Sequence, residues 1–165
     1  MEPKSLTQHL LALDPDGFKK ATQTKFLEEG GKGILSEDVL GRWLSQDRLY
    51  AQAYIRFAAH IISQIQLPAK VEAGDINERL LDLFIDALTN VRSEIKFFER
   101  TAGRYGLGID AEEESEAVGE YKTLFEETAE KGDMLRTMVL LWGTEKVSPF
   151  PPLPLLFLGD ADENP

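Results

Sequence analysis

The sequence predicts an all-α protein built as a bundle of long antiparallel helices. Every long segment repeats its apolar residues at the three- and four-residue spacing of a helix, and the alternating pattern of a strand is absent. The chain has 165 residues and an ordinary apolar fraction of 42%, which is enough to bury one hydrophobic core. Long amphipathic helices with short connections form such a core by packing against one another.

In the first half of the chain, turn residues set the expected helix limits. We expect residues 1–17 to form a short helix or arm that ends at the turn sequence LDPDG, and residues 18–29 to form an amphipathic helix stopped by GGKG. Ser36 is a good N-cap for a long helix that reaches about Gln66. The following Leu67-Pro68 pair stops that helix.

Three further helices are expected in the second half. The first starts near Asp75, reaches about Tyr105 and ends at Gly106, because glycine readily adopts the left-handed C-cap conformation. The others cover about 116–131 and 134–147. We therefore expect one helical domain over residues 1–147.

The composition changes after Val147, where the proline-rich sequence SPFPPLPLLFLGDADENP begins. Proline lacks the amide hydrogen that a helix needs, so the last helix cannot continue into this segment. We expect residues 148–165 to be a disordered tail. A proline-rich ligand segment is the alternative.

The charge and the composition exclude several classes of function. The net charge is −11 and no basic patch is present, which argues against nucleic acid or an anionic membrane as partner. With no cysteine and two histidines, disulfides, thiolate chemistry and a histidine-rich metal site are not expected. No segment has the length of a membrane span or the pattern of a signal peptide. We expect a cytoplasmic protein without metal or cofactor.

Trp43, Asp47, Tyr50 and Tyr54 fall at i, i+4, i+7 and i+11, which places them on one stripe of the 36–66 helix. The rest of this stripe is apolar, and a carboxylate in such a place is costly unless something uses it. Flanking aromatic rings suggest a pocket for a flat, polar, nitrogen-rich molecule. The alternative is a buried aspartate that only ties helices together, and the spacing leaves both interpretations open.

A second carboxylate, Glu145, continues a predicted core-facing stripe with Met134, Met138 and Leu141. In a dry pocket two carboxylates can divide into an acid and a base, with Tyr121 as a neighbouring phenol. Glu94 lies beside the apolar stripe of the 75–105 helix. Helical spacing alone does not show that Asp47 and Glu145 meet.

Three segments of the chain resemble the TenA, or thiaminase-II (PqqC-like), family. The run ILSEDVLGRWLSQDRLYAQAYIRFAAHI is similar to that family's active-site helix. The runs NVRSEIKFFERTAGRYGL and GDMLRTMVLLWGTEKV are similar to later helices, so the resemblance covers roughly residues 20–147. It implies a heme-oxygenase-like helical fold that binds no heme.

The resemblance also implies a function in thiamin metabolism, namely hydrolysis of a C–N bond in an aminomethyl- or formylaminomethyl-pyrimidine. It implies that Asp47 and Tyr50 hold the pyrimidine and that Tyr121 completes the pocket. Trp43 and Tyr54 would add aromatic walls. Glu145 would transfer protons, as in the branch of the family that carries glutamate instead of a catalytic cysteine. Homo-oligomers are expected because family members are often tetramers.

The chain departs from the family pattern after residue 147. The family continues there with further helices that close the bundle, so we expect this chain to be truncated and its C-terminal helices to be missing. The alternative function is therefore a non-catalytic helical remnant. Such a remnant would expose an apolar groove that binds a small heterocycle or a partner protein.

Overall fold

The structure is a computed structural model that describes residues 5–70, 73–110 and 113–147, and the elements within these ranges are all helices. The all-α class is confirmed, whereas the heme-oxygenase-like arrangement stays a prediction. The expected tail at 148–165 lies outside the described residues. No helix in the described ranges is long and apolar enough to cross a lipid bilayer. The helices are α1 (Leu6–Leu13), α2 (Pro15–Thr22), α3 (Lys25–Gly31), α4 (Glu37–Gln64), α5 (Ile76–Tyr105), α6 (Glu116–Lys131) and α7 (Met134–Val147).

The chain divides into two compact units. Of the described residues, one unit contains 5–35 together with 138–147, and the other lies within 36–137. Within the first unit, α1 and α2 contact each other. The single domain expected over residues 1–147 stays a prediction.

The N-terminal segment contains the short helix expected within residues 1–17, but it has two further helices where one was expected over 18–29, because its polar residues cap helices. The Asp14 carboxylate accepts a hydrogen bond of 2.8 Å from the amide of Gly17, and Pro15 occupies the first helical position of α2. Thr24 caps α3 in the same way through the amide of Leu27. LDPDG therefore ends α1, as expected, and also starts α2. The expected 18–29 helix is interrupted before Thr24.

The long helices agree closely with the expected limits. Ser36 caps α4 through the amide of Val39. Asp75 caps α5 by accepting from two amides, and Gly106 ends α5 with a left-handed φ of 65°. Gly132 ends α6 with a φ of 64°. These caps satisfy backbone groups that a helix end leaves without partners.

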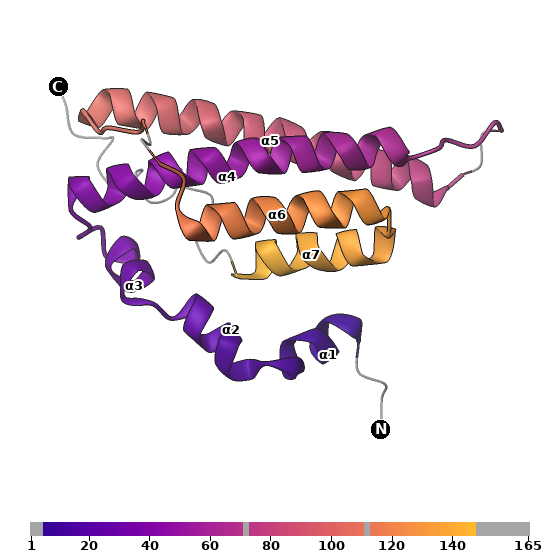
Figure 1. The fold of residues 1–165 in the computed structure, drawn as a ribbon, viewed down its shortest axis with the longest axis horizontal. Helices are drawn as coiled ribbons and strands as arrows, with labels where there is room; N and C mark the ends of the chain where they lie inside the picture. The colour runs from indigo at the N-terminus through magenta and orange to yellow at the C-terminus, as the bar shows by residue number, and fades with distance from the viewer. Residues whose placement is uncertain (1–4, 71–72, 111–112, 148–165) are drawn as a thin grey trace. The chain divides into compact units, whose positions relative to one another are not determined.

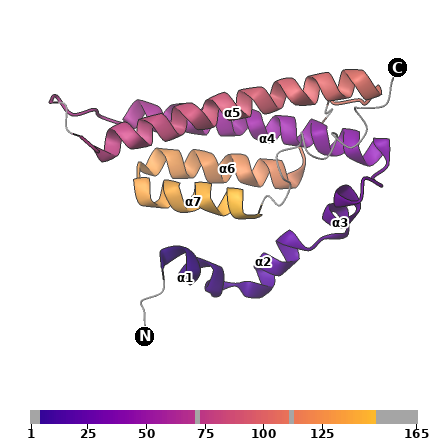
Figure 2. The same ribbon diagram turned by 180° about the vertical axis from the view of Figure 1, so that it is seen from behind.

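Helix α4 lies between α5 and α6 and packs against both of them (Figures 1 and 2). The start of α4 meets residues beyond the end of α5, and the side chain of Asn77 near the start of α5 donates to the carbonyl of Gln66 at 2.9 Å, so α4 and α5 are antiparallel. Gln46 and Gln64 of α4 bond residues at the start and the end of α6, respectively, so α4 and α6 are parallel.

The hydrophobic core of this unit lies along α4, which contributes side chains to both interfaces. Burial of this apolar surface is the main force that holds the three helices together. The buried apolar residues of α4, α5 and α6 are Leu44, Ala51, Tyr54, Phe57, Ala58, Ile61, Leu80, Phe84, Ile95, Phe98, Ala102, Val118, Phe125 and Ala129.

Gly41 allows a close approach between the first turns of α4 and the segment that follows α5. It is buried, and a Cβ at this position would lie 2.9 Å from the carbonyl oxygen of Gly108. Atoms at that distance overlap, so a side chain here would push the two backbones apart. The absence of a side chain at Gly41 therefore sets the spacing at this end of the α4–α5 pair.

Candidate functional site

The carboxyl group of Asp47 is mostly buried on α4, as the stripe predicted. Its burial, and secondly the nearby charge of Glu94 on α5, raise the pKa of Asp47 from 3.8 to about 7. Near neutral pH this group therefore divides between a neutral form, which can donate a hydrogen bond, and an anion, which accepts one. A carboxyl group with such a pKa is a common feature of functional sites, although structural groups show it too.

Two of the predicted tyrosines meet across the α4–α6 interface. The ring centroids of Tyr50 and Tyr121 lie 5.3 Å apart in an edge-to-face arrangement. Phe125 of α6 lies against Tyr50 at 5.6 Å and against Tyr54 at 5.9 Å, and it stacks on Phe57 at 4.8 Å. These five residues form an aromatic cluster that packs α4 on α6, with edge-to-face and stacked pairs of the kind that aromatic rings prefer.

Trp43 occupies a different interface. Its ring meets Phe98 of α5 at a centroid distance of 6.4 Å, edge to face. The predicted stripe of α4 is thus shared between two neighbours: Trp43 packs on α5, and the tyrosines pack on α6. Asp47 lies between these two groups along α4. The aromatic residues of the stripe therefore pack against the neighbouring helices.

The second carboxylate differs from the one expected. Glu145 is exposed, whereas the buried residues of α7 are Thr137, Leu141 and Thr144 at i, i+4 and i+7. Leu141 is buried as predicted, whereas Thr137 and Thr144 occupy the buried positions expected of Met138 and Glu145, each one residue earlier in the helix. The acidic group that acts on the pKa of Asp47 is Glu94.

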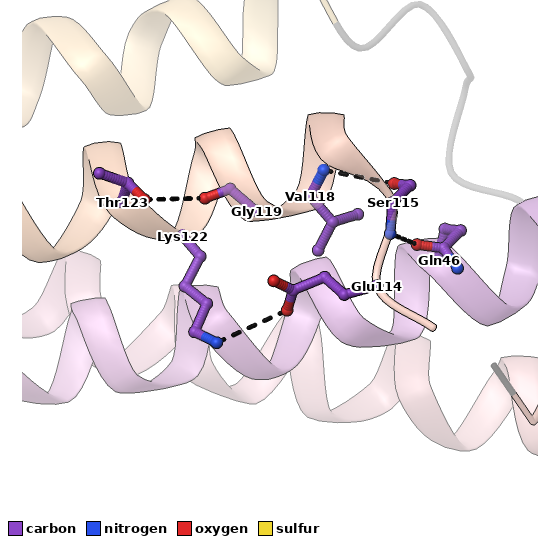
Figure 3. A network of polar contacts seen from close by, with 7 residues as sticks. All are labelled: Gln46, Glu114, Ser115, Val118, Gly119, Lys122 and Thr123. Atoms are coloured by element: carbon purple, nitrogen blue, oxygen red, sulfur yellow. Dashed lines mark hydrogen bonds and ion pairs between the residues drawn. The ribbon is translucent and has the colours of Figure 1, made fainter. Parts of the chain in front are cut away.

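Gln46, next to Asp47, holds the start of α6 through both atoms of its amide. Its nitrogen donates to the carbonyl of Glu113 at 2.9 Å. Its oxygen accepts from the backbone amide of Ser115 at 2.8 Å, the bond drawn in Figure 3. Ser115 in turn caps α6 through the amide of Val118. The sequence does not single out Gln46, because a glutamine in a polar run carries no distinctive spacing.

A metal centre is not indicated within the described ranges, where no group of three or more histidine, aspartate or glutamate side chains converges. The carboxyl pair of Asp47 and Glu94 lacks the third protein ligand that most metal sites in proteins contain. What the site offers chemically is one carboxyl group of raised pKa on a rigid helix, between two sets of aromatic contacts.

Comparison with known proteins overturns the resemblance to the TenA family. No family model matches the chain, and no solved structure matches it. A protein of Fusarium pseudograminearum (strain CS3096) is 35% identical over 149 residues, which are 87% of this chain. That relative is named "Probable transcription factor". The chain spans only 29% of its length.

The assignment to thiamin metabolism was therefore wrong, and so was the assigned hydrolysis of an aminopyrimidine, because the relative carries the name of a regulator of transcription. The most specific part of the resemblance was the Trp-x-x-x-Asp-x-x-Tyr pattern of α4, and in this chain its aromatic residues pack on α5 and α6. The catalytic roles of Asp47 and Glu145 rested on that resemblance. The substrate-binding roles of four residues rested on it too: Trp43, Tyr50, Tyr54 and Tyr121. No finding tests either the catalytic or the substrate-binding roles.

Proposed function

We propose that this chain is an acidic, helical protein-binding module of a regulator of transcription and that it does not itself contact DNA. The observation that carries the proposal is the 35% identity over 149 residues to a fungal protein named as a probable transcription factor. The matched residues are 29% of that relative, so this proposal concerns one part of a regulator.

The charge of the chain supports a role other than DNA contact. It has 29 acidic and 18 basic residues, for a net charge of −11. Binding to DNA is driven largely by basic side chains that neutralise phosphates, and an acidic chain is repelled by them. The expectation that nucleic acid is not a direct partner thus becomes part of the proposal.

Exposed apolar side chains on α5 support a protein partner. Ile76, Leu83 and Ile85 are 59%, 44% and 47% exposed, respectively. Ile76 and Leu83 are seven residues apart, so they share one side of the helix. Apolar side chains that share a helix face are typical contacts for a partner protein. A module of this kind acts in the nucleus, and the cytoplasmic location expected from the sequence would then apply only before import.

Two measurements test the proposal. Fused to an unrelated DNA-binding domain, the chain should change the output of a reporter gene, and Leu83→Glu should reduce that change. Gln52→Glu, which adds the same charge at an exposed polar position of α4, is the matched control. In fluorescence anisotropy, the chain alone should not bind a mixed-sequence DNA duplex at low salt.

Saturable binding to the duplex that weakens with added salt would refute the exclusion of DNA contact. A reporter output identical to that of the DNA-binding domain alone would refute the regulatory role.

A further inference from the structure

A cavity lies between α4 and α6, the two helices that the aromatic cluster packs together. It has a volume of about 80 Å³. The two helices line it at regular spacing, so that each contributes residues from two successive turns. The lining residues are Ala53, Arg56, Phe57 and His60 of α4 and Lys122, Phe125, Glu126 and Ala129 of α6.

The inner part of this cavity is apolar. Phe57 and Phe125 stack with a centroid distance of 4.8 Å and an interplanar angle of 17°, and both are buried. Ala53 and Ala129 leave the space open because their side chains are short. A small hydrocarbon group that enters would meet apolar walls whose aromatic rings already pack on one another, which limits the ordering that binding requires.

The mouth of the cavity is basic, in contrast to the chain as a whole. Arg56 and His60 line it from α4, and Lys122 lines it from α6. Glu126 is the one acidic residue of the lining, so the mouth carries a net charge of +1 with His60 neutral. Lys122 is paired with Glu114 at 3.6 Å, but both side chains are about 40% exposed, and such a pair is weak.

The size of the cavity limits what can enter. A volume of about 80 Å³ is well below the roughly 300–1,000 Å³ of sites that enclose a drug-sized ligand. It exceeds the roughly 10–15 Å³ that one water molecule needs, so a group of a few non-hydrogen atoms fits. An anion of single charge matches the charge of +1 at the mouth, and a short hydrocarbon stem matches the apolar inner part of the cavity.

From this combination we infer that the α4–α6 cavity binds a carboxylate group on a short apolar stem. Arg56 and Lys122 donate to the carboxylate, with His60 beside them, and the methylene groups contact Phe57 and Phe125. The carboxylate belongs either to a small carboxylic acid or to an acidic side chain of a bound peptide. The inference does not rest on the proposed function, because binding is measured directly on the isolated chain.

The test is a titration of the ¹⁵N-labelled 165-residue chain, followed by ¹H–¹⁵N NMR at constant ionic strength. Sodium propionate should cause saturable shifts at the amides of residues 53–60 and 122–129. Propionamide, which has the same shape without the charge, should cause none. Capped Ala-Glu-Ala and Ala-Gln-Ala peptides identify the source of the group: binding of propionate indicates a small acid, and binding of the glutamate peptide alone indicates a partner's side chain.

Substitutions at the mouth should act in opposite directions according to charge. Arg56→Gln and Lys122→Gln should each weaken binding about tenfold, the loss that accompanies one charge-assisted hydrogen bond. Glu126→Gln should strengthen binding, because it removes the one acidic residue of the lining. Arg79→Gln on the exposed surface of α5 is the control and should have no effect. These positions are partly or fully exposed, and circular dichroism confirms that each variant folds.

Three results would overturn the inference. The first is the absence of saturable shifts with both propionate and the glutamate peptide. The second is equal binding of propionate and propionamide, which would show that the charge of the ligand does not contribute to its affinity for the cavity. The third is inorganic phosphate that saturates the same amides at lower concentration than propionate, which would assign a different anion to the cavity.

Discussion

The raised pKa of Asp47 makes the stability of the fold depend on pH in a direction that can be calculated. The pKa is about 7 in the folded chain and 3.8 for the free carboxyl group. Between these values the folded chain keeps a proton that the unfolded chain releases, so the contribution of Asp47 to stability falls as the pH rises. Above about pH 7 both states are ionised, and the cost of the buried anion is then fully present.

The magnitude follows from the difference in pKa. Each unit corresponds to about 1.4 kcal/mol, so a rise from 3.8 to about 7 destabilises the folded chain by up to about 4 kcal/mol at pH 8.5. At pH 5.5 the same calculation gives about 2 kcal/mol. Asp47→Asn removes the charge and keeps the shape. We therefore expect it to stabilise the chain, with a gain that increases by about 2 kcal/mol from pH 5.5 to pH 8.5.

The assay is urea unfolding of both chains at the two pH values, followed by the helical signal in circular dichroism. Both values lie above the isoelectric point of 4.7, where the chain would be least soluble. Asp86→Asn on α5 removes the same charge from an exposed position, and its effect should stay within about 0.5 kcal/mol at both pH values. An Asp47→Asn gain that is equal at pH 5.5 and pH 8.5, or a loss at both, would refute the argument from burial.

Two further substitutions test the packing around α4. Gly41→Ala should lower the free energy of unfolding by about 1–3 kcal/mol, because the new methyl group overlaps the carbonyl of Gly108. A Cβ added at Gly103 in α5 would meet no atom within 4 Å. Gly103→Ala should therefore stabilise the chain by up to about 1 kcal/mol in the same urea unfolding experiment. Gln46→Ala should cost about 1–3 kcal/mol through two lost hydrogen bonds and speed amide exchange at the start of α6. Equal effects for Gln46→Ala and for Gln52→Ala, an exposed position of α4, would contradict that role.

The long helices could be predicted because their signals are local. Ser36, Gly106 and Gly132 act through their own helix ends, so the neighbouring sequence determines them. The starts of α2 and α3 were missed because Asp14 and Thr24 are equally good turn residues and helix caps. Short segments of this kind contain too few apolar residues for periodicity to decide between the two.

The candidate site was predictable only in part, for a similar reason. Helical spacing showed that Asp47 lies on the apolar face of α4, and its burial confirms this. Spacing could not show that the acidic neighbour is Glu94 rather than Glu145, because that depends on which helices pack together. It also could not separate a ligand pocket from a helix contact. The rings of Tyr50 and Tyr121 pack edge to face on one another. A helix that lines a pocket and a helix that packs on a neighbour have the same sequence periodicity.

The parallel arrangement of α4 and α6 has a consequence for how the unit assembles. The hydrogen bonds that fasten α6 join residues 65 to 69 positions apart, whereas α4 and α5 are connected by a short loop and can pair locally. Because a longer loop costs more entropy to close, we expect the α4–α5 pair to form first and α6 to dock onto it last. Release of α6 alone would then separate the two walls of the α4–α6 cavity and expose Tyr50, Tyr54 and Phe57 to solvent. The helix that completes the unit is thus also the one whose detachment would empty its binding site.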